Sequence, residues 1–416
     1  MNFFLIKGYN VSGVSFFSKF VTLLLLLDNV LVIYGTEATS ISSILQLICI
    51  LVYFVFLGGF HNLHKRIVNV PKFINCYFFY LILLTFTIST ILPIGYLKII
   101  LWYIVFFNVI DYRYLLKSYQ AMVVVVIAFF YIQEITHFLT GVRVLGYIPG
   151  LPLRLAASSN DMMGYLEGIA TGTRSSSIFS EPAHLAQWLF PMLCIRLFSK
   201  EHYNMKRALF ICFTLLLTKS GNAMFGLAAV GAYYIYLHTL KNNNVSQRIK
   251  GIVLIFAGIV AFSIYSSSSL GSEVMERQET LSVSNEMDKG YATSSFMRIY
   301  RGYFIYNDYS FVEKIFGNPS EDAFWKHARN SGIFHLFKEN DTYLNTVHRI
   351  LIFTGIIGAI FILLLVFDLF KKNTPEACAL LCAWILFSFI SSGFFTGYTS
   401  IYFAFIYLSK KHIQKY

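Results

Sequence analysis

The stretch of the chain with the most evident chemical potential runs from Arg174 to Phe190 and reads RSSSIFSEPAHLAQWLF. Charged groups at the mouth of an apolar run are costly unless they serve a function. Pro182 suits the first turn of a helix and Glu181 suits its amino end, so a helix start is predicted here. A cap alone would explain Glu181 and Pro182 but not the nearby Arg and His. We therefore expect Arg174, Glu181 and His184 to line an outer cavity.

A second group of candidates is a pair of arginines. Arg298 and Arg301 are three residues apart in a segment with helical spacing, so they would project together. Paired guanidinium groups grip phosphate oxygens through charge-assisted hydrogen bonds, which suits them to a pyrophosphate. The alternative is that both side chains extend toward lipid headgroups.

A third pair, Glu134 and His137, falls near the end of a long apolar run. Ionisable groups inside a membrane are functional candidates, although a mutually hydrogen-bonded structural pair is equally compatible with the spacing. Asp28 and Arg196 are weaker candidates, since Arg196 can extend to the membrane surface.

Several familiar signatures are missing from the sequence. There is no P-loop, no HExxH, no GxSxG and no dinucleotide-binding glycine pattern. His327, His335 and His348 have no metal-like spacing with carboxylates, and the six cysteines fall inside apolar runs. We therefore expect neither a metal nor a cofactor. A serine hydrolase built on the Ser175–Ser177 run and His184 is only weakly indicated.

The elements that must position these residues are membrane helices. The chain has 416 residues, 56% of them hydrophobic and 13% charged, with a mean hydropathy of +0.62. This composition predicts an all-α, polytopic helical bundle with about twelve transmembrane helices, forming one transmembrane domain over residues 1–416. The expected spans are 14–34, 41–60, 74–91, 97–110, 119–139, 184–198, 208–218, 222–240, 251–265, 350–370, 376–391 and 397–409.

The distribution of positive charge predicts the orientation. Lys and Arg gather in alternate short connections, and the short connections between them contain only Lys219. By the positive-inside rule both termini are expected in the cytoplasm, and two long loops, 140–183 and 266–349, on the outer face. The net charge of +12 then belongs to the cytoplasmic rim, and a nucleic-acid partner is not expected.

The second outer loop changes character along its length. Residues 266–345 carry eight Lys and Arg against eleven Asp and Glu. The loop opens with Ser-, Gly- and Glu-rich sequence of low apolar content, which is typical of mobile segments. It then becomes amphipathic, which predicts a helix on the membrane surface or over a cavity, with a stop at Gly317.

Three stretches together resemble a known family. Residues 215–230, reading LLLTKSGNAMFGLAAV, are similar to the opening of a later span in bacterial O-antigen and capsular polysaccharide polymerases of the Wzy type, and in the related O-antigen ligases. The end of the second outer loop is similar to theirs at Asp341, Tyr343, Leu344, Asn345, Thr354, Gly355 and Gly358. The family's arginine-then-F-x-EP-(S/A)-H-x-A signature is matched by Arg174, Phe179, Glu181, Pro182, His184 and Ala186.

The resemblance implies an activity on the outer face of the bacterial inner membrane. A polymerase of this family transfers an undecaprenyl-pyrophosphate-linked glycan to the non-reducing end of another lipid-linked repeat unit, as in lipopolysaccharide or capsule biosynthesis. Glu181 or His184 would be the catalytic base, and Arg174, Arg298 and Arg301 would bind the pyrophosphate. Glu134, His137, Asp341 and Asn345 form a second tier.

Two alternatives remain open. An O-antigen ligase differs in its acceptor, but ligases carry a His directly before the Asn of the outer-loop motif, where this chain has Asn340 or Leu344. A lipid-linked oligosaccharide flippase should show related halves, which the sequence lacks. The family also implies contact with membrane lipids and a chain-length-regulating membrane protein as a partner.

Overall fold

A computed structural model describes residues 14–36, 39–61, 63–88, 94–154, 174–237, 299–334, 344–371 and 373–413. The described part of the chain is all-helical and contains no strand. Two isolated bridges join Tyr34 to Leu153 and Gly35 to Ser40. The elements are α1 Phe16–Leu31, α2 Ile41–Leu51, the π-helical turn η1 Val52–Phe56, α3 Leu63–Val68, α4 Lys72–Ile88, α5 Ile94–Val109, α6 Tyr112–Thr140, α8 Pro182–Phe198, α9 Met205–Leu217, α10 Gly221–Ile235, α15 Arg301–Asp308, α16 Phe311–Phe316, α17 Glu321–Asn330, α18 Thr346–Lys371, α19 Pro375–Ser388 and α20 Tyr398–Ile413.

Eleven of the twelve predicted apolar segments overlap these helices, and segment 251–265 lies outside the described residues. Two helices, α6 and α18, are long and apolar enough to cross a membrane. Both carry strongly exposed apolar side chains, including Phe138 at 87% and Phe367 at 69% exposure. Such surfaces are unusual in contact with water, and their length and hydropathy suit a lipid environment.

Local sequence signals explain where several helices begin and end. Asp111 caps α6 by accepting a hydrogen bond from the Tyr114 amide at 2.9 Å, and Gly141 ends it with a positive φ of 74°. Glu181 is the N-cap of α8 and Pro182 its first residue, as the sequence predicted.

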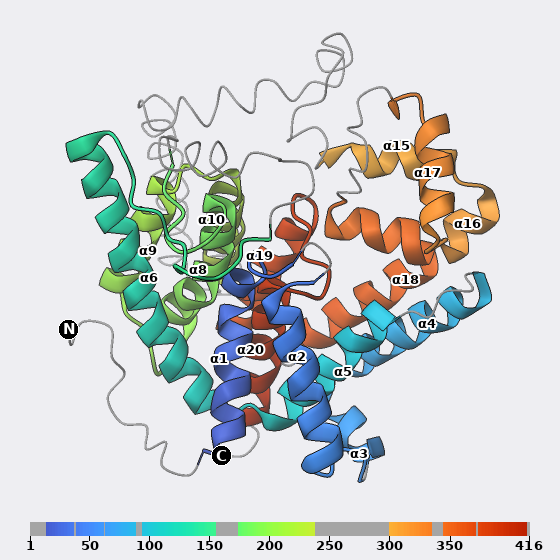
Figure 1. Cartoon of the computed structure of the whole chain (residues 1–416), viewed down its shortest axis with the longest axis horizontal. Helices are drawn as coiled ribbons and strands as arrows, with labels where there is room; N and C mark the ends of the chain where they lie inside the picture. Colours follow the sequence, from blue (N-terminus) through green and yellow to red (C-terminus); the bar gives the residue numbers. More distant parts are fainter. Residues whose placement is uncertain are drawn as a thin grey trace, which may run out of the picture.

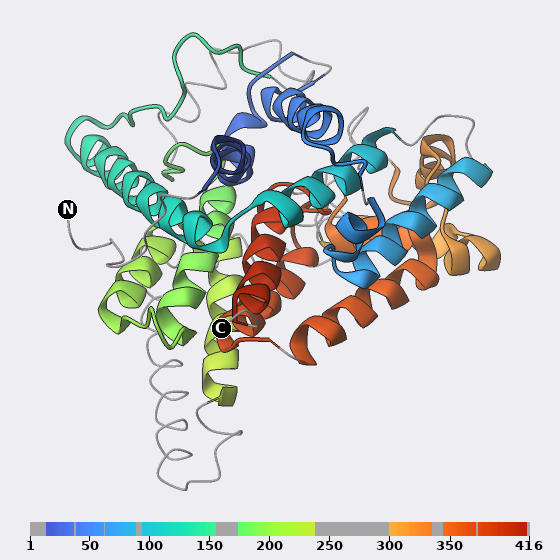
Figure 2. The same ribbon diagram turned by 90° about the horizontal axis from the view of Figure 1, so that it is seen from below.

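The helices form one packed body with α20 near its centre. Figure 2 shows α20 flanked on one side by α8, α9 and α10 and on the other by α4 and α18. α20 packs against α1, α5, α6, α8 and α19. The start of α1 and the end of α20 lie on the same side of the molecule, at the bottom of Figure 1.

The predicted single amphipathic helix before Gly317 is in fact two helices. α15 ends at Asp308, and Ser310 starts α16 with a capping box in which Ser310 and Glu313 bond reciprocally. The Ser-x-x-Glu spacing of Ser310 and Glu313 indicates this second helix start, whereas the apolar periodicity around it predicts one continuous helix. α16 does end before Gly317, as expected. α15 and α16 pack against α18, and α17 packs against α15, at the upper right of Figure 1.

Gly317 and Gly355 allow the end of α16 to pack directly against α18. α18 is kinked at Gly355, whose φ of 59° and ψ of −159° belong to a region that is essentially restricted to glycine. Gly317, with φ 81° and ψ 173°, lies in the same region. A Cβ atom on Gly355 would come within 2.4 Å of the Ile315 carbonyl oxygen. The Asn318 amide also donates to the Ile352 carbonyl at 2.8 Å, so the two backbones meet directly.

Replacement of Gly355 by Ala should therefore destabilise the protein. Backbone strain of this kind costs on the order of 1–3 kcal/mol, and the steric conflict adds to it. We expect the thermal unfolding midpoint of the detergent-purified protein to fall by several degrees. Gly231→Ala in α10 is the matched control, because a Cβ there meets no atom within 4 Å and φ is not positive. Equal midpoints for the two variants would contradict the assignment.

Candidate functional site

A polar cavity of about 390 Å³ lies where α1 ends, where α2, α8, α10 and α20 begin, and against one side of α5. Its volume falls in the range typical of small-molecule sites. The residues that line it come from six helices and from the connection between α19 and α20. They are Asp28, Asn29, Val32, Ser40, Ser42, Ser43, Gln46, Lys98, Ile99, Trp102, Glu181, Ala183, His184, Gln187, Asn222, Ser391, Ser392, Gly393, Phe395, Thr396, Gly397, Tyr398 and Ser400.

The start of α8 contributes three polar residues to this cavity. Glu181, His184 and Gln187 are spaced three apart, so they share one helix face, and all three line the cavity. Glu181 is exposed and makes no capping hydrogen bond with its side chain. The Nδ1 atom of His184 lies 2.9 Å from the Ser180 hydroxyl. The Ser180 contact orients the imidazole ring of His184 at the cavity wall.

Ser391 joins this face to the opposite wall. Its hydroxyl accepts hydrogen bonds from the Gln187 side-chain amide at 2.6 Å and from the Asn222 side-chain amide at 2.9 Å. Its carbonyl accepts bonds from the backbone amide and the hydroxyl of Thr346, both at 3.0 Å. Asn222 belongs to the family-like stretch 215–230, so this motif reaches the cavity through α10.

The third wall is built from the N-terminal part of the chain. The buried Asp28 carboxylate accepts hydrogen bonds from the Ser42 hydroxyl, from the Gln46 side-chain amide at 2.9 Å and from the Gly397 amide at 3.0 Å. Lys98 donates to the Ser43 hydroxyl at 3.0 Å and interacts electrostatically with Asp28. Asp28 was a weaker sequence candidate. Gln46 and Lys98 were missed, although each is a lone polar group in an apolar helix.

The segment that carries Arg174 is fastened to the end of α6. The Ser175 hydroxyl donates to Glu134 and accepts from the Arg143 Nε at 2.8 Å, and Arg143 lies 3.5 Å from Glu134. Arg174 itself is half-buried and does not line the cavity. Glu134 therefore has a positioning role in this structure.

The expected pairing of Glu134 with His137 is not formed. Within the described residues the His137 Nδ1 atom has no hydrogen-bond partner, and Glu134 bonds to Ser175 and Arg143 instead. The hydroxyl of Ser177 is also engaged, because it donates to the Val126 carbonyl at 2.8 Å. With Ser175 and Ser177 both used to hold the segment, the structure offers no support for a serine nucleophile there.

Arg301, one of the two arginines predicted to bind pyrophosphate from the second loop, does not reach the cavity wall. Arg301 is fully buried at the start of α15 and is not among the lining residues. It interacts electrostatically with His348 in α18. Its burial contradicts the alternative in which Arg301 extends to lipid headgroups. Arg298 and Asp341 lie outside the described residues.

Asn345 lies behind the cavity wall. Its side-chain amide donates to the Phe389 carbonyl at 2.6 Å, and its side-chain oxygen accepts from the His348 amide at 2.8 Å. These bonds fix the start of α18 against the 389–393 segment, part of which lines the cavity. The family-like stretch that contains Asn345 thus contacts the site indirectly, through the backbone that it supports.

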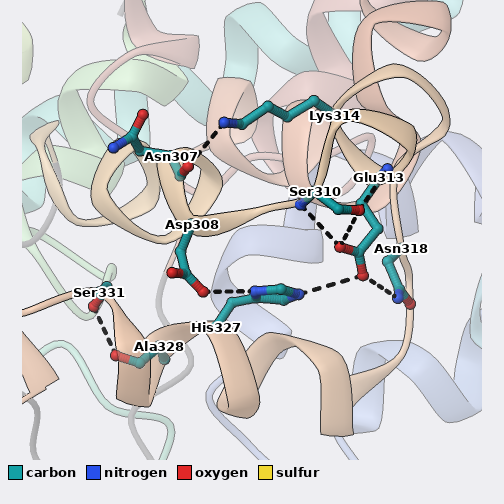
Figure 3. Close-up of polar contacts among 9 residues, drawn as sticks. All are labelled: Asn307, Asp308, Ser310, Glu313, Lys314, Asn318, His327, Ala328 and Ser331. Carbon is teal, nitrogen blue, oxygen red and sulfur yellow. Dashed lines mark hydrogen bonds and ion pairs between the residues drawn. The ribbon is translucent and has the colours of Figure 1, made fainter.

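A separate polar cluster joins α15, α16 and α17. Figure 3 shows the His327 ring of α17 between Asp308 of α15 and Glu313 of α16. The ring nitrogens lie 2.8 Å from Asp308 and 3.3 Å from Glu313. Only an imidazolium can donate to both carboxylates at once. Partial burial opposes ionisation of Glu313, but hydrogen bonds from Ser310, Asn318 and His327 lower its pKa to about 2.

No group of three or more His, Cys, Asp or Glu side chains suited to a metal ion occurs in the described ranges. The six cysteines are all free thiols, as the sequence indicated. The side chains that line the cavity offer a carboxylate and an imidazole that can take a proton, together with amide, hydroxyl and ammonium groups that can bind polar substrate atoms.

The lowered pKa of Glu313 predicts that acid weakens the packing of α15, α16 and α17. Because its folded pKa is lowered from 4.5 to about 2, the stability it contributes is complete above pH 4.5 and is lost as the pH falls toward 2. We expect Glu313→Gln to reduce the fall in thermal midpoint between pH 5 and pH 3. Glu321→Gln, at an exposed position of α17, should leave that fall unchanged. The prediction fails if both variants follow the wild-type pH curve.

Comparison of the chain with models of known protein families, with characterised proteins and with solved structures finds no match. The features that bear on function are therefore the sequence motifs and the cavity that some of their residues line. Of the motif residues, Glu181 and His184 lie on the cavity wall itself.

Proposed function

We propose that this chain is a polysaccharide polymerase of the Wzy type. The observation that carries the proposal is that Glu181 and His184, the centre of the family-like signature, lie together on the wall of one polar cavity. The substrates would be undecaprenyl-pyrophosphate-linked oligosaccharides, and the reaction would be metal-independent glycosyl transfer.

The proposed reaction is a single displacement. Glu181 or His184 accepts the proton of an acceptor sugar hydroxyl, whose oxygen forms a bond to the anomeric carbon of the donor. The bond from that carbon to the pyrophosphate oxygen breaks, and undecaprenyl pyrophosphate leaves as an anion. General-base assistance of this kind is typically worth about 10²–10⁴-fold.

The helix arrangement favours the departure of an anion. Four helices begin at the cavity, namely α2, α8, α10 and α20. Their amino ends carry partial positive charge, and fixed dipoles of this kind stabilise charge that develops during a reaction. Arg174, which directly precedes the anchored Ser175, would bind the pyrophosphate at the edge of the cavity.

The proposed location is the bacterial inner membrane, with about twelve spans and both termini in the cytoplasm. The two long apolar helices and the exposed apolar side chains support a membrane location. The cavity lies opposite the side on which α1 starts and α20 ends. The positive-inside rule places the termini in the cytoplasm and hence the cavity on the outer face. A chain-length-regulating membrane protein would be a partner.

The proposal predicts that Glu181→Gln and His184→Gln each abolish or strongly reduce polymerisation. Loss of the base should slow the reaction by about 10²–10⁴-fold, and loss of the other residue by less. The surface glycan would collapse to a single repeat unit on each lipid core, as resolved by gel electrophoresis. Glu321→Gln is the matched control. Long chains at normal protein levels in both cavity variants would refute the assignment, whereas complete loss of glycan from the core would favour an O-antigen ligase.

The Ser180 contact predicts which residue is the base. If His184 takes the proton, Ser180→Ala removes the hydrogen bond that orients its ring, and the turnover rate should fall up to about tenfold. The acid limb of the pH–rate profile should shift as well. If Glu181 is the base, the shape of the profile stays the same. Polymerisation of purified lipid-linked repeat units across pH separates the two cases.

A further inference from the structure

The N-terminal wall of the cavity is formed by Asp28, Asn29, Ser42, Gln46, Lys98 and Trp102, which come from α1, α2 and α5. None of these residues belongs to the family-like motifs. All but Lys98 are at least nine-tenths buried, yet five of the six are polar or charged and the sixth, Trp102, carries a polar N–H. A wall of this composition is costly to bury unless its polar groups are satisfied.

The charged groups of this wall are satisfied within the protein. Asp28 accepts three hydrogen bonds, from Ser42, Gln46 and the Gly397 amide. Lys98 lies close enough to Asp28 for mutual attraction. The wall therefore presents no uncompensated charge of its own.

Three neutral atoms around the cavity are not satisfied. The Asn29 Nδ2, the Trp102 Nε1 and the Gln187 Oε1 atoms are buried and have no hydrogen-bond partner among the described residues. All three residues line the cavity. Each unsatisfied buried group costs about 1–3 kcal/mol, so water or a ligand in the cavity is expected to supply the missing partners.

We propose that Asn29, Trp102 and Gln187 form a binding subsite for an uncharged, hydroxyl-rich sugar ring. This inference rests on the proposed function, in which the ring belongs to the acceptor glycan. Sugar hydroxyls both donate and accept, as two donors and one acceptor require. The Trp102 ring adds an apolar face for the carbon–hydrogen side of the sugar. Held there, an acceptor hydroxyl would lie in the same cavity as Glu181 and His184.

An anionic group fits this subsite less well. Among the described residues that line the cavity, Asp28 and Glu181 carry formal negative charge and Lys98 is the only lysine or arginine. A pyrophosphate would gain little from the neutral atoms left unpaired, and the Glu181 carboxylate would repel it because Lys98 is already engaged with Asp28. The subsite therefore suits a sugar ring, and the pyrophosphate would bind elsewhere in the proposed enzyme.

The test is binding of a soluble glycan to the full-length, detergent-purified protein. The probe is the repeat-unit oligosaccharide released by mild acid from the lipid that accumulates in cells lacking this chain. Calorimetry should show saturable binding to the wild type and to Glu181→Gln. Asn29→Asp and Trp102→Phe should each weaken binding about tenfold, because the first replaces the donating NH2 group by an acceptor oxygen and the second removes the indole N–H.

Tyr103→Phe is the matched control. Tyr103 follows Trp102 in α5 and its hydroxyl is buried, but it does not line the cavity. This variant should bind as the wild type does. Inorganic pyrophosphate, tested as a competitor, should not displace the glycan. Thermal midpoints verify that each variant is folded.

The outcomes distinguish the subsite from the enzyme activity. Absence of glycan binding to the wild type, or equal binding by Asn29→Asp and the wild type, would overturn the subsite even if Glu181→Gln stops polymerisation. Displacement by pyrophosphate would also overturn it, because the site would then be an anion site. Glycan binding that depends on Asn29, in a protein unable to polymerise repeat units, would support the subsite and refute the proposed function.

Discussion

The buried carboxylate of Asp28 is the interaction on which the cavity depends. Its two oxygens accept from Ser42, from Gln46 and from the Gly397 amide, so one side chain ties α1 to α2 and to the connection between α19 and α20. In that connection Phe395 and Gly397 both have positive φ values, 51° and 55°. A strained turn of this kind persists only where its surroundings hold it. Asp28 and the Asn345–Thr346 contacts behind it provide that support.

The helices were largely predictable from the sequence because apolar periodicity and capping residues are local signals. The start of α8 at Pro182 and the end of α16 before Gly317 follow directly from them. The kink at Gly355 was not predictable, because a glycine in an apolar run is compatible with an unbroken helix. A glycine is required at position 355 because the Ile315 carbonyl approaches it closely, and that approach is a tertiary contact.

The site was predictable in part, for a related reason. Glu181 and His184 stand out because they interrupt an apolar run in a recognisable order, and both line the cavity. Arg301 has the same prominence in the sequence, yet the structure buries it against α18. Gln46 and Lys98 are single polar residues in otherwise apolar helices, distant in sequence from the motif. Only packing reveals that they face the same space.

In the proposed enzyme, the distribution of charge implies that different groups bind the glycan and stabilise the leaving pyrophosphate. A cavity dominated by arginines would hold a pyrophosphate tightly in both substrate and product, and such uniform binding does not accelerate turnover. Here Asp28 and Glu181 outnumber Lys98 among the described lining charges, while four helix amino ends contribute only partial positive charge. This arrangement can stabilise charge as the leaving group departs without retaining the product. Affinity for the glycan would then come from neutral hydrogen bonds at Asn29, Trp102 and Gln187, which are the groups that the protein leaves unpaired.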